Sequence, residues 1–119
     1  MIDFLFDSIA RGSSLQLKID LADTFDALTD FTGAAFTFYG TSDSRVLPAL
    51  AEVKASSGAG ITASGTRKQS LLIVVDNVCS SLPNYDITIM CELKATMLDG
   101  FETSIGRGPL LVKAAVSPS

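Results

Sequence analysis

The fold of this chain is decided by residues 85–116, which read YDITIMCELKATMLDGFETSIGRGPLLVKAAV. Residues 85–94 alternate between apolar and mostly polar side chains, a period of two that places one apolar row on one face of a β-strand. The row comprises Tyr85, Ile87, Ile89, Cys91 and Leu93. The dipeptide Asp99-Gly100 then favours a hairpin, because both residue types accept a positive φ. Two further strands are expected at residues 101–105 and 110–116, separated by a turn, so that the chain ends in a β-meander.

Strand signals recur through the rest of the chain. They lie at residues 15–21, 34–39, 46–53 and 71–75, and a short hairpin is expected around Ile61. Residues 46–53 are predicted to be an edge strand, because Pro48 has no N–H group to donate to a neighbour. Phe36 and Ile89 are expected to face inward. About seven to nine short strands without a sustained helical period predict an all-β fold, specifically a β-sandwich.

The length of 119 residues is enough for one domain whose hydrophobic core needs neither disulfides nor a metal ion. We expect residues 1–11 to form an N-terminal arm and residues 12–119 to form the β-sandwich domain. The apolar residues of the arm fit one face of a strand or one face of a helix. In either conformation they are too apolar to be left in water, and the residues expected to bind a partner are Ile2, Phe4, Leu5 and Phe6.

The composition is both apolar and acidic. Apolar residues make up 47% of the chain and the mean hydropathy is +0.37, which is more than a free soluble monomer needs. Part of this apolar surface is therefore expected to cover a partner. A net charge of −4 argues against binding to nucleic acid, which requires clustered Lys and Arg. The basic pair Arg67-Lys68 is expected at a loop tip, either simply solvated or in contact with an acidic neighbour.

Targeting signals are not evident. No segment approaches the roughly 20 apolar residues of a membrane-spanning helix. The first residues include Asp3 and Asp7 but no early Lys or Arg, so they lack the basic start of a secretory signal. We expect the protein to be made and kept in a cytoplasm, away from the membrane.

The chain contains no histidine, and so it lacks the commonest general base and the commonest nitrogen ligand of zinc. A glycosidase can operate with two carboxylates alone, for which the candidates are Asp20, Asp23, Asp26, Asp30, Asp99 and Glu102. Turn chemistry and solubility explain these carboxylates more simply, and the aspartate spacing matches no calcium-binding loop. Cys79 and Cys91 are expected to be reduced and packed. We therefore expect no enzymatic activity, no metal and no cofactor.

Five short motifs, taken in order, resemble those of the immunoglobulin-like domains of tailed-phage tail and baseplate proteins, such as the N-terminal domain of siphophage upper baseplate proteins. The motifs are IARGSSL at residues 9–15, LTDFTGA at 28–34, SGAGIT at 57–62, SLPNYDI at 81–87, and DG at 99–100 with GPLLV at 108–112. Each consists of turn residues next to an alternating strand, and the match covers residues 9–116. Two positions differ from the family pattern, because Ser13 replaces an acidic residue and Asn84 replaces a glycine.

The resemblance implies a single immunoglobulin-like antiparallel β-sandwich without enzymatic activity. It further implies a structural protein of the virion, from the tail, neck or fibre-anchoring region, which assembles with copies of itself or with other virion proteins through strand edges and the arm. A capsid decoration protein of the same fold is the alternative. A carbohydrate-binding module is a further alternative, for which Tyr39 and Tyr85 are the best sugar-stacking candidates in a chain without tryptophan.

Overall fold

Strands make up most of the computed structural model, which describes residues 2–4, 6, 8–10, 12–21, 30–42, 52–76 and 86–113. The strands are β1 (Ile2–Asp3), β2 (Ile9–Ala10), β3 (Leu15–Asp20), β4 (Ala35–Ser42), β5 (Glu52–Ser57), β6 (Gly60–Ser64), β7 (Ser70–Val75), β8 (Ile87–Thr96) and β9 (Glu102–Lys113). A 3-10 turn, η2 (Thr66–Lys68), connects β6 to β7. These residues contain no α-helix, so the predicted all-β class is confirmed.

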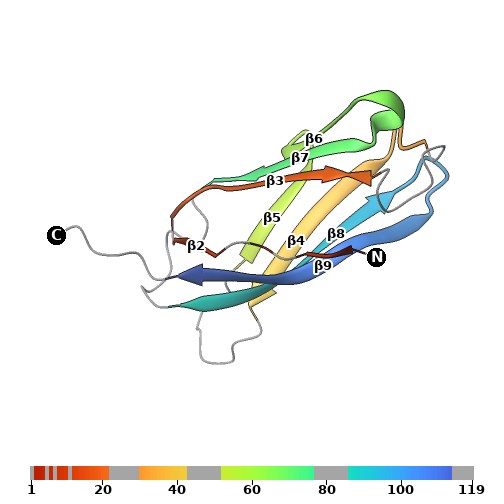
Figure 1. Ribbon diagram of the computed structural model, residues 1–119. Helices are drawn as coiled ribbons and strands as arrows, with labels where there is room; N and C mark the ends of the chain where they lie inside the picture. The colour runs from red at the N-terminus through yellow and green to blue at the C-terminus, as the bar shows by residue number, and fades with distance from the viewer. Residues whose placement is uncertain are drawn as a thin grey trace.

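The strands belong to one continuous sheet, in the order β1-β9-β8-β4-β5-β6-β7-β3, with β2 also paired to β9. The sheet curls so that β9, β8 and β4 lie opposite β3, β7 and β6, and β5 joins the two sides (Figure 1). Most neighbours are antiparallel, but β1 and β2 run parallel to β9, and β5 runs parallel to β6. The result is a mixed sheet nearly closed into a barrel, where the sequence predicts a purely antiparallel sandwich.

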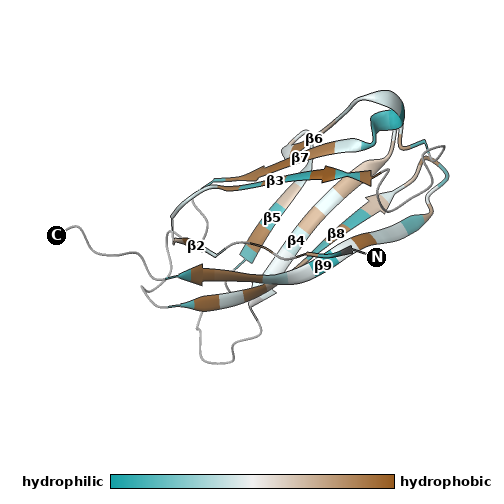
Figure 2. Cartoon of the chain, in the orientation of Figure 1, coloured by the Kyte–Doolittle hydropathy of each residue, from teal (hydrophilic) through white to brown (hydrophobic). Residues whose placement is uncertain are grey.

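The ladder between β8 and β9 confirms the prediction of paired strands at the end of the chain. Every second residue of β8 is buried, and the colouring by hydropathy shows the alternation along the strands (Figure 2). A β-bulge at Ile105 interrupts the ladder where β8 passes from Leu93 to Lys94. The extra residue shifts the alternation of β9 by one position, so that Ile105 and Gly106 are both buried.

The strands predicted at residues 101–105 and 110–116 form one strand, so the prediction of a turn between them is wrong. Pro109 does not end β9, because it lies between the two short ladders that β1 and β2 make with the outer edge of this strand. A residue without an N–H group is tolerated at such an edge.

The N-terminal arm lies along the edge of the same sheet. β1 pairs with residues 106–107 of β9, and β2 pairs with residues 112–113. Between these ladders Phe4 is buried, and its N–H group donates a hydrogen bond of 2.9 Å to the Arg107 carbonyl oxygen. The described residues of the arm therefore share one sheet and one core with the expected sandwich domain.

The core fills the space between the two sides of the curled sheet. Its largest fully buried side chains come from both sides and include Leu21, Phe31, Phe36, Phe38, Ile73, Ile89, Leu93, Ile105 and Leu110. Phe36 and Ile89 are 1% and 0% exposed, which confirms that both face inward. Cys91 is buried as predicted, whereas Cys79 lies outside the described residues.

The strand β5 differs from the prediction both in its residue range and in its location within the sheet. An edge strand is predicted over residues 46–53, whereas β5 begins at Glu52 and lies inside the sheet, between β4 and β6. Its inward residues are Val53 and Ala55, which alternate with exposed polar neighbours. Pro48 lies outside the described residues.

Candidate interaction surface

The aromatic residues of the arm, which the sequence assigns to partner binding, pack into their own chain. Phe4 is 6% exposed, and its ring centroid lies 5.3 Å from that of Phe6. The Phe6 ring packs edge-on against the Phe38 ring of β4, and the two ring centroids lie 6.2 Å apart. Ile2 forms part of β1, and Leu5 lies outside the described residues. This arrangement leaves little of Phe4 exposed for a partner, because its ring completes the core between the arm and β4.

A glycine on β9 makes room for the arm. Gly108 lies directly beneath Phe4, so that a Cβ atom at this position would lie 2.9 Å from the Phe4 Cβ atom and closer still to the Phe4 carbonyl oxygen. Such distances are too short for real Cβ contacts. Gly108 is therefore required for the close approach of the arm to β9.

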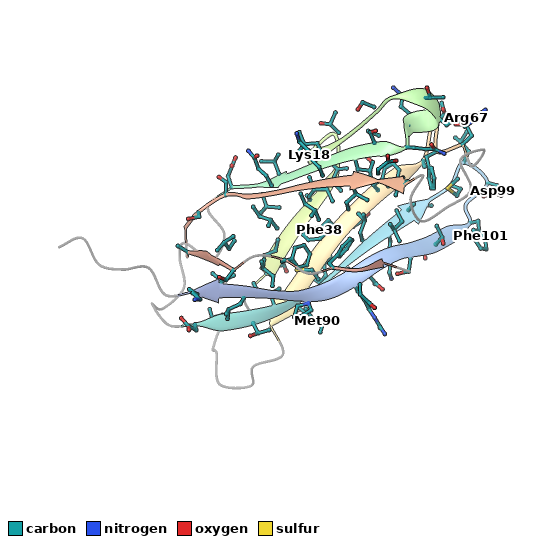
Figure 3. The ribbon with its side chains drawn as sticks, in the orientation of Figure 1. Lys18, Phe38, Arg67, Met90, Asp99 and Phe101 are labelled. Atoms are coloured by element: carbon teal, nitrogen blue, oxygen red, sulfur yellow. The ribbon has the colours of Figure 1, made fainter. Side chains whose placement is uncertain are left out.

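Three segments meet at one end of the sheet and form what we call the loop end, residues 30–34, 65–69 and 97–101. The Phe31 N–H group donates a hydrogen bond of 2.9 Å to the Arg67 carbonyl oxygen, which joins the first two segments. Gly33 abuts Leu98, because a Cβ atom at Gly33 would lie 2.9 Å from the Leu98 side chain. Figure 3 shows that the side chains of Arg67, Asp99 and Phe101 lie at this same end of the sheet.

The turn between β8 and β9 carries the most exposed apolar side chains of the loop end. Leu98 is 81% exposed and Phe101 is 66% exposed. The turn is closed by hydrogen bonds from the Gly100 N–H to the Met97 carbonyl and from the Met97 N–H to the Phe101 carbonyl, both 2.8 Å long. The Phe101 N–H also donates to the Asp99 carboxylate at 2.9 Å. A well-braced backbone therefore presents two large apolar groups to solvent.

The basic pair predicted at a loop tip lies in η2. Arg67 and Lys68 are exposed, and their φ angles of 55° and 51° place both in the left-handed region. Residues with side chains reach this region at a cost of roughly 1–3 kcal/mol each. The turn is held by the Lys68 N–H group, which donates to the Gly65 carbonyl at 3.2 Å. The loop end thus displays two cations from a backbone in an uncommon conformation.

Charges of both signs meet at the loop end. The pKa of Asp30 is lowered, chiefly because its carboxylate accepts hydrogen bonds from the Thr32 side chain and backbone, and further by the positive charge of Arg67. The backbone bond from the Thr32 N–H group is 2.9 Å long. Asp30 is therefore ionised at neutral pH, beside a guanidinium group.

The carboxylates considered for catalysis are dispersed or have turn-forming roles. Asp20 ends β3, and Glu102 begins β9. Asp30 and Asp99 each accept a backbone hydrogen bond from the residue two positions later, which is ordinary turn chemistry. Asp23 and Asp26 lie outside the described residues. Within the described ranges, no three Cys, Asp or Glu residues are grouped in a way that would hold a metal ion.

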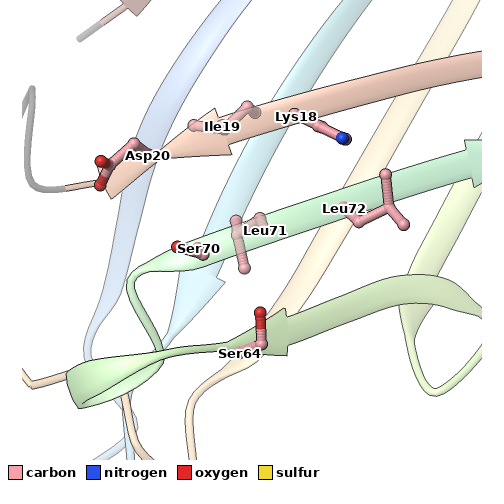
Figure 4. Close-up of a pocket in the computed structure, with 7 residues that line it drawn as sticks. All are labelled: Lys18, Ile19, Asp20, Ser64, Ser70, Leu71 and Leu72. Atoms are coloured by element: carbon pink, nitrogen blue, oxygen red, sulfur yellow. The ribbon is translucent and has the colours of Figure 1, made fainter.

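A shallow depression of about 530 Å³ lies on β3, β6 and β7 (Figure 4). It is lined by Lys18, Ile19, Asp20, Ser64, Ser70, Leu71 and Leu72. Lys18 and Asp20 are exposed at its β3 side, and Leu72 contributes an apolar centre. The depression is open to solvent, so it offers a surface and not an enclosed pocket.

Of the two tyrosines considered for sugar stacking, Tyr39 lies within the described residues. Tyr39 is 43% exposed on β4, and its hydroxyl group donates a hydrogen bond of 3.2 Å to Glu52. Tyr85 lies outside the described residues.

Sequence reasoning missed Leu98 and Phe101 as surface residues. Phe101 follows the turn dipeptide Asp99-Gly100, so the sequence predicts that it begins the next strand. Leu98 lies shortly after an alternating segment, and its apolar side chain gives no indication that it is exposed. The signal that finds them is their position immediately on either side of the turn dipeptide, where a side chain projects beyond the end of the sheet.

In the part of the chain that the structure describes, no helix is long and apolar enough to cross a lipid bilayer.

Comparisons with known proteins do not assign the chain to a family. No protein-family model matches the sequence, and no curated protein matches it with a significant score.

Proposed function

We propose that this chain is a non-enzymatic structural protein of a bacteriophage virion, from the tail, neck or fibre-anchoring region, and that its loop end docks on a neighbouring protein of the particle. The observation that carries the docking role is the exposure of Leu98 and Phe101 on a hydrogen-bonded turn. Large apolar side chains that are held in water by a braced backbone are typical of interaction sites. The assignment to a virion rests on the five motifs that resemble phage tail and baseplate domains.

We further propose that the curled sheet is a variant of the immunoglobulin-like fold. The order β9-β8-β4-β5 corresponds to strands G, F, C and C′ of a variable-type domain, and β3-β7-β6 corresponds to strands B, E and D. In this correspondence the arm takes the place of strand A beside strand G. The loop end then corresponds to one of the two clusters of loops that such domains carry at their ends, from which recognition often occurs.

The expected energy of docking comes mainly from apolar burial. Full burial of a Leu or Phe side chain contributes about 1.5–3 kcal/mol, so that Leu98 and Phe101 together can anchor an interface. Arg67 and Lys68, on the neighbouring segment of the loop end, add a preference for a partner with carboxylates beside its apolar pocket.

The virion assignment is tested by quantitative mass spectrometry of purified particles from the host that encodes the chain. We expect a fixed copy number of a few to a few dozen per particle, as for tail and neck components. Hundreds of copies per particle would instead support the capsid decoration alternative. Absence of the protein from washed particles would overturn the virion assignment.

The docking role is tested by the double variant Leu98→Ser/Phe101→Ser, introduced into the phage. We expect its incorporation into particles to fall by tenfold or more, because two apolar anchors are lost. The matched control is Met90→Ser, which alters a side chain that is 56% exposed on β8, away from the loop end. Incorporation of the double variant at the level of the control would show that the loop end is not the docking surface.

A further inference from the structure

Another depression lies on the outward face of β4 and β5 and has a volume of about 240 Å³. It is lined by Thr37, Tyr39, Lys54, Ala55, Ser56 and Ala59. The ladder between the two strands pairs Thr37 with Ser56 and Tyr39 with Lys54. The side chains of paired residues in an antiparallel ladder lie next to each other on the same face. The depression therefore combines a ring and an ammonium group in one row with two hydroxyl groups in the next row.

The Tyr39 ring is both exposed and anchored. It is 43% exposed, and its hydroxyl group donates a hydrogen bond of 3.2 Å to the Glu52 carboxylate, which also lies 3.8 Å from the Lys54 ammonium group. On the opposite side, Tyr39 pairs with Glu92 of β8, and the Glu92 carboxylate lies 3.4 Å from the Lys94 ammonium group. Among the described residues, the carboxylates on both sides of the ring thus have an ammonium group beside them, so the charges around the ring balance.

These features restrict the class of ligand that fits the depression. Residues 37–41 of β4 pair with β5 on one side and with β8 on the other, so β4 offers no open edge to an extended peptide. An apolar ligand would bury the hydroxyl groups of Thr37 and Ser56 without hydrogen-bonding partners, which is unfavourable. A charged ligand gains little from charges that already balance. A neutral ligand with an apolar face and many hydroxyl groups fits best.

We propose that this depression binds a neutral saccharide, with one hexose ring stacked on Tyr39. The C–H groups on one face of a pyranose ring are weakly positive and the face of an aromatic ring is negative, so the two faces attract each other. Successive side chains on one face of a strand are roughly 7 Å apart. The substituents of a sugar on Tyr39 therefore reach Thr37 and Ser56, whose hydroxyl groups both donate and accept hydrogen bonds. The proposed site shares no residue with the loop end and is independent of the virion assignment.

The proposal is tested by NMR titration of the full chain, labelled with nitrogen-15, with millimolar cellohexaose, maltohexaose, mannohexaose and β-1,4-galactohexaose. We expect at least one of these oligosaccharides to shift the backbone amide resonances of residues 37–39 and 54–56 in a saturable manner. Tyr39→Ala is expected to raise the dissociation constant roughly tenfold or more, because the stacking face is lost. Tyr39→Phe keeps the ring, so its dissociation constant is expected to stay closer to that of the wild type than to that of Tyr39→Ala.

The matched control is Leu72→Ala, which truncates a side chain that is 36% exposed on β7, outside the depression. We expect this variant to bind like the wild type, and thermal melting of every variant verifies that its fold is retained. Trigalacturonate, which carries a carboxylate on each sugar unit, is expected to bind more weakly than the neutral ligand. The proposal is overturned if none of the four neutral oligosaccharides binds saturably, if Tyr39→Ala binds like the wild type, or if trigalacturonate binds more tightly than all four.

Discussion

At the scale of single residues, the side chains that face the inside of the curled sheet dominate stability. Phe36 and Ile89 lie on neighbouring strands and are almost completely buried. We predict that Phe36→Ala and Ile89→Ala each lower the free energy of unfolding by about 2–5 kcal/mol, because apolar burial is lost and a cavity remains. Denaturant titration measures this loss.

The control for this prediction is the neighbour of Ile89 on the same strand. Met90 points outward and is 56% exposed, so Met90→Ala is expected to change the free energy of unfolding by no more than about 0.5 kcal/mol. Equal midpoints for Ile89→Ala and Met90→Ala would contradict the assignment of the two faces of β8.

At the scale of elements, the arm is attached to the sheet through two short ladders and the packing of Phe4. We predict that Gly108→Ala separates the arm from β9, because the added methyl group would overlap the Phe4 backbone. Hydrogen exchange should show lost protection of the Phe4 amide, which donates to the Arg107 carbonyl. The strands β3 and β7, which do not contact Gly108 through the ladder, should keep their protection.

The control for the arm is Leu111→Ala, a substitution on the same strand at a side chain that is 37% exposed. Exchange at the Phe4 amide should be unchanged in this variant. Protection of that amide in Gly108→Ala at the wild-type level would show that the arm tolerates a side chain beneath it.

At the scale of the whole molecule, a protein with a purely structural role is expected to have no catalytic activity. We predict that the purified protein cleaves no polysaccharide and that Asp99→Asn and Glu102→Gln leave incorporation into particles nearly unchanged. Asp99 already has a role as a turn acceptor, and Asn can accept the same hydrogen bond. Polysaccharide cleavage that disappears in either variant would replace the structural proposal with a carboxylate enzyme.

The candidate surface was only partly accessible to sequence reasoning. A basic pair at Arg67-Lys68 is visible as a polar interruption between strand signals. Leu98 and Phe101 are marked as surface residues only by their position on either side of the turn dipeptide Asp99-Gly100, because an apolar residue next to a strand otherwise has the same pattern whether it ends in the core or beyond the sheet. The apolar arm illustrates the converse, since Phe4 has the composition of an exposed anchor but completes the core of its own chain.

The sequence by itself determined the all-β class and the inward faces of β4 and β8. It did so because side chains alternate across any β-strand, so that a period of two predicts the buried row without knowledge of the partner strand. Only the tertiary structure decided that the arm runs parallel to β9, that β9 continues through Pro109, and that β3 comes last in the order of the described strands. The reason is that strand pairing joins residues far apart in the chain, and strands with the same alternation fit many neighbours equally well.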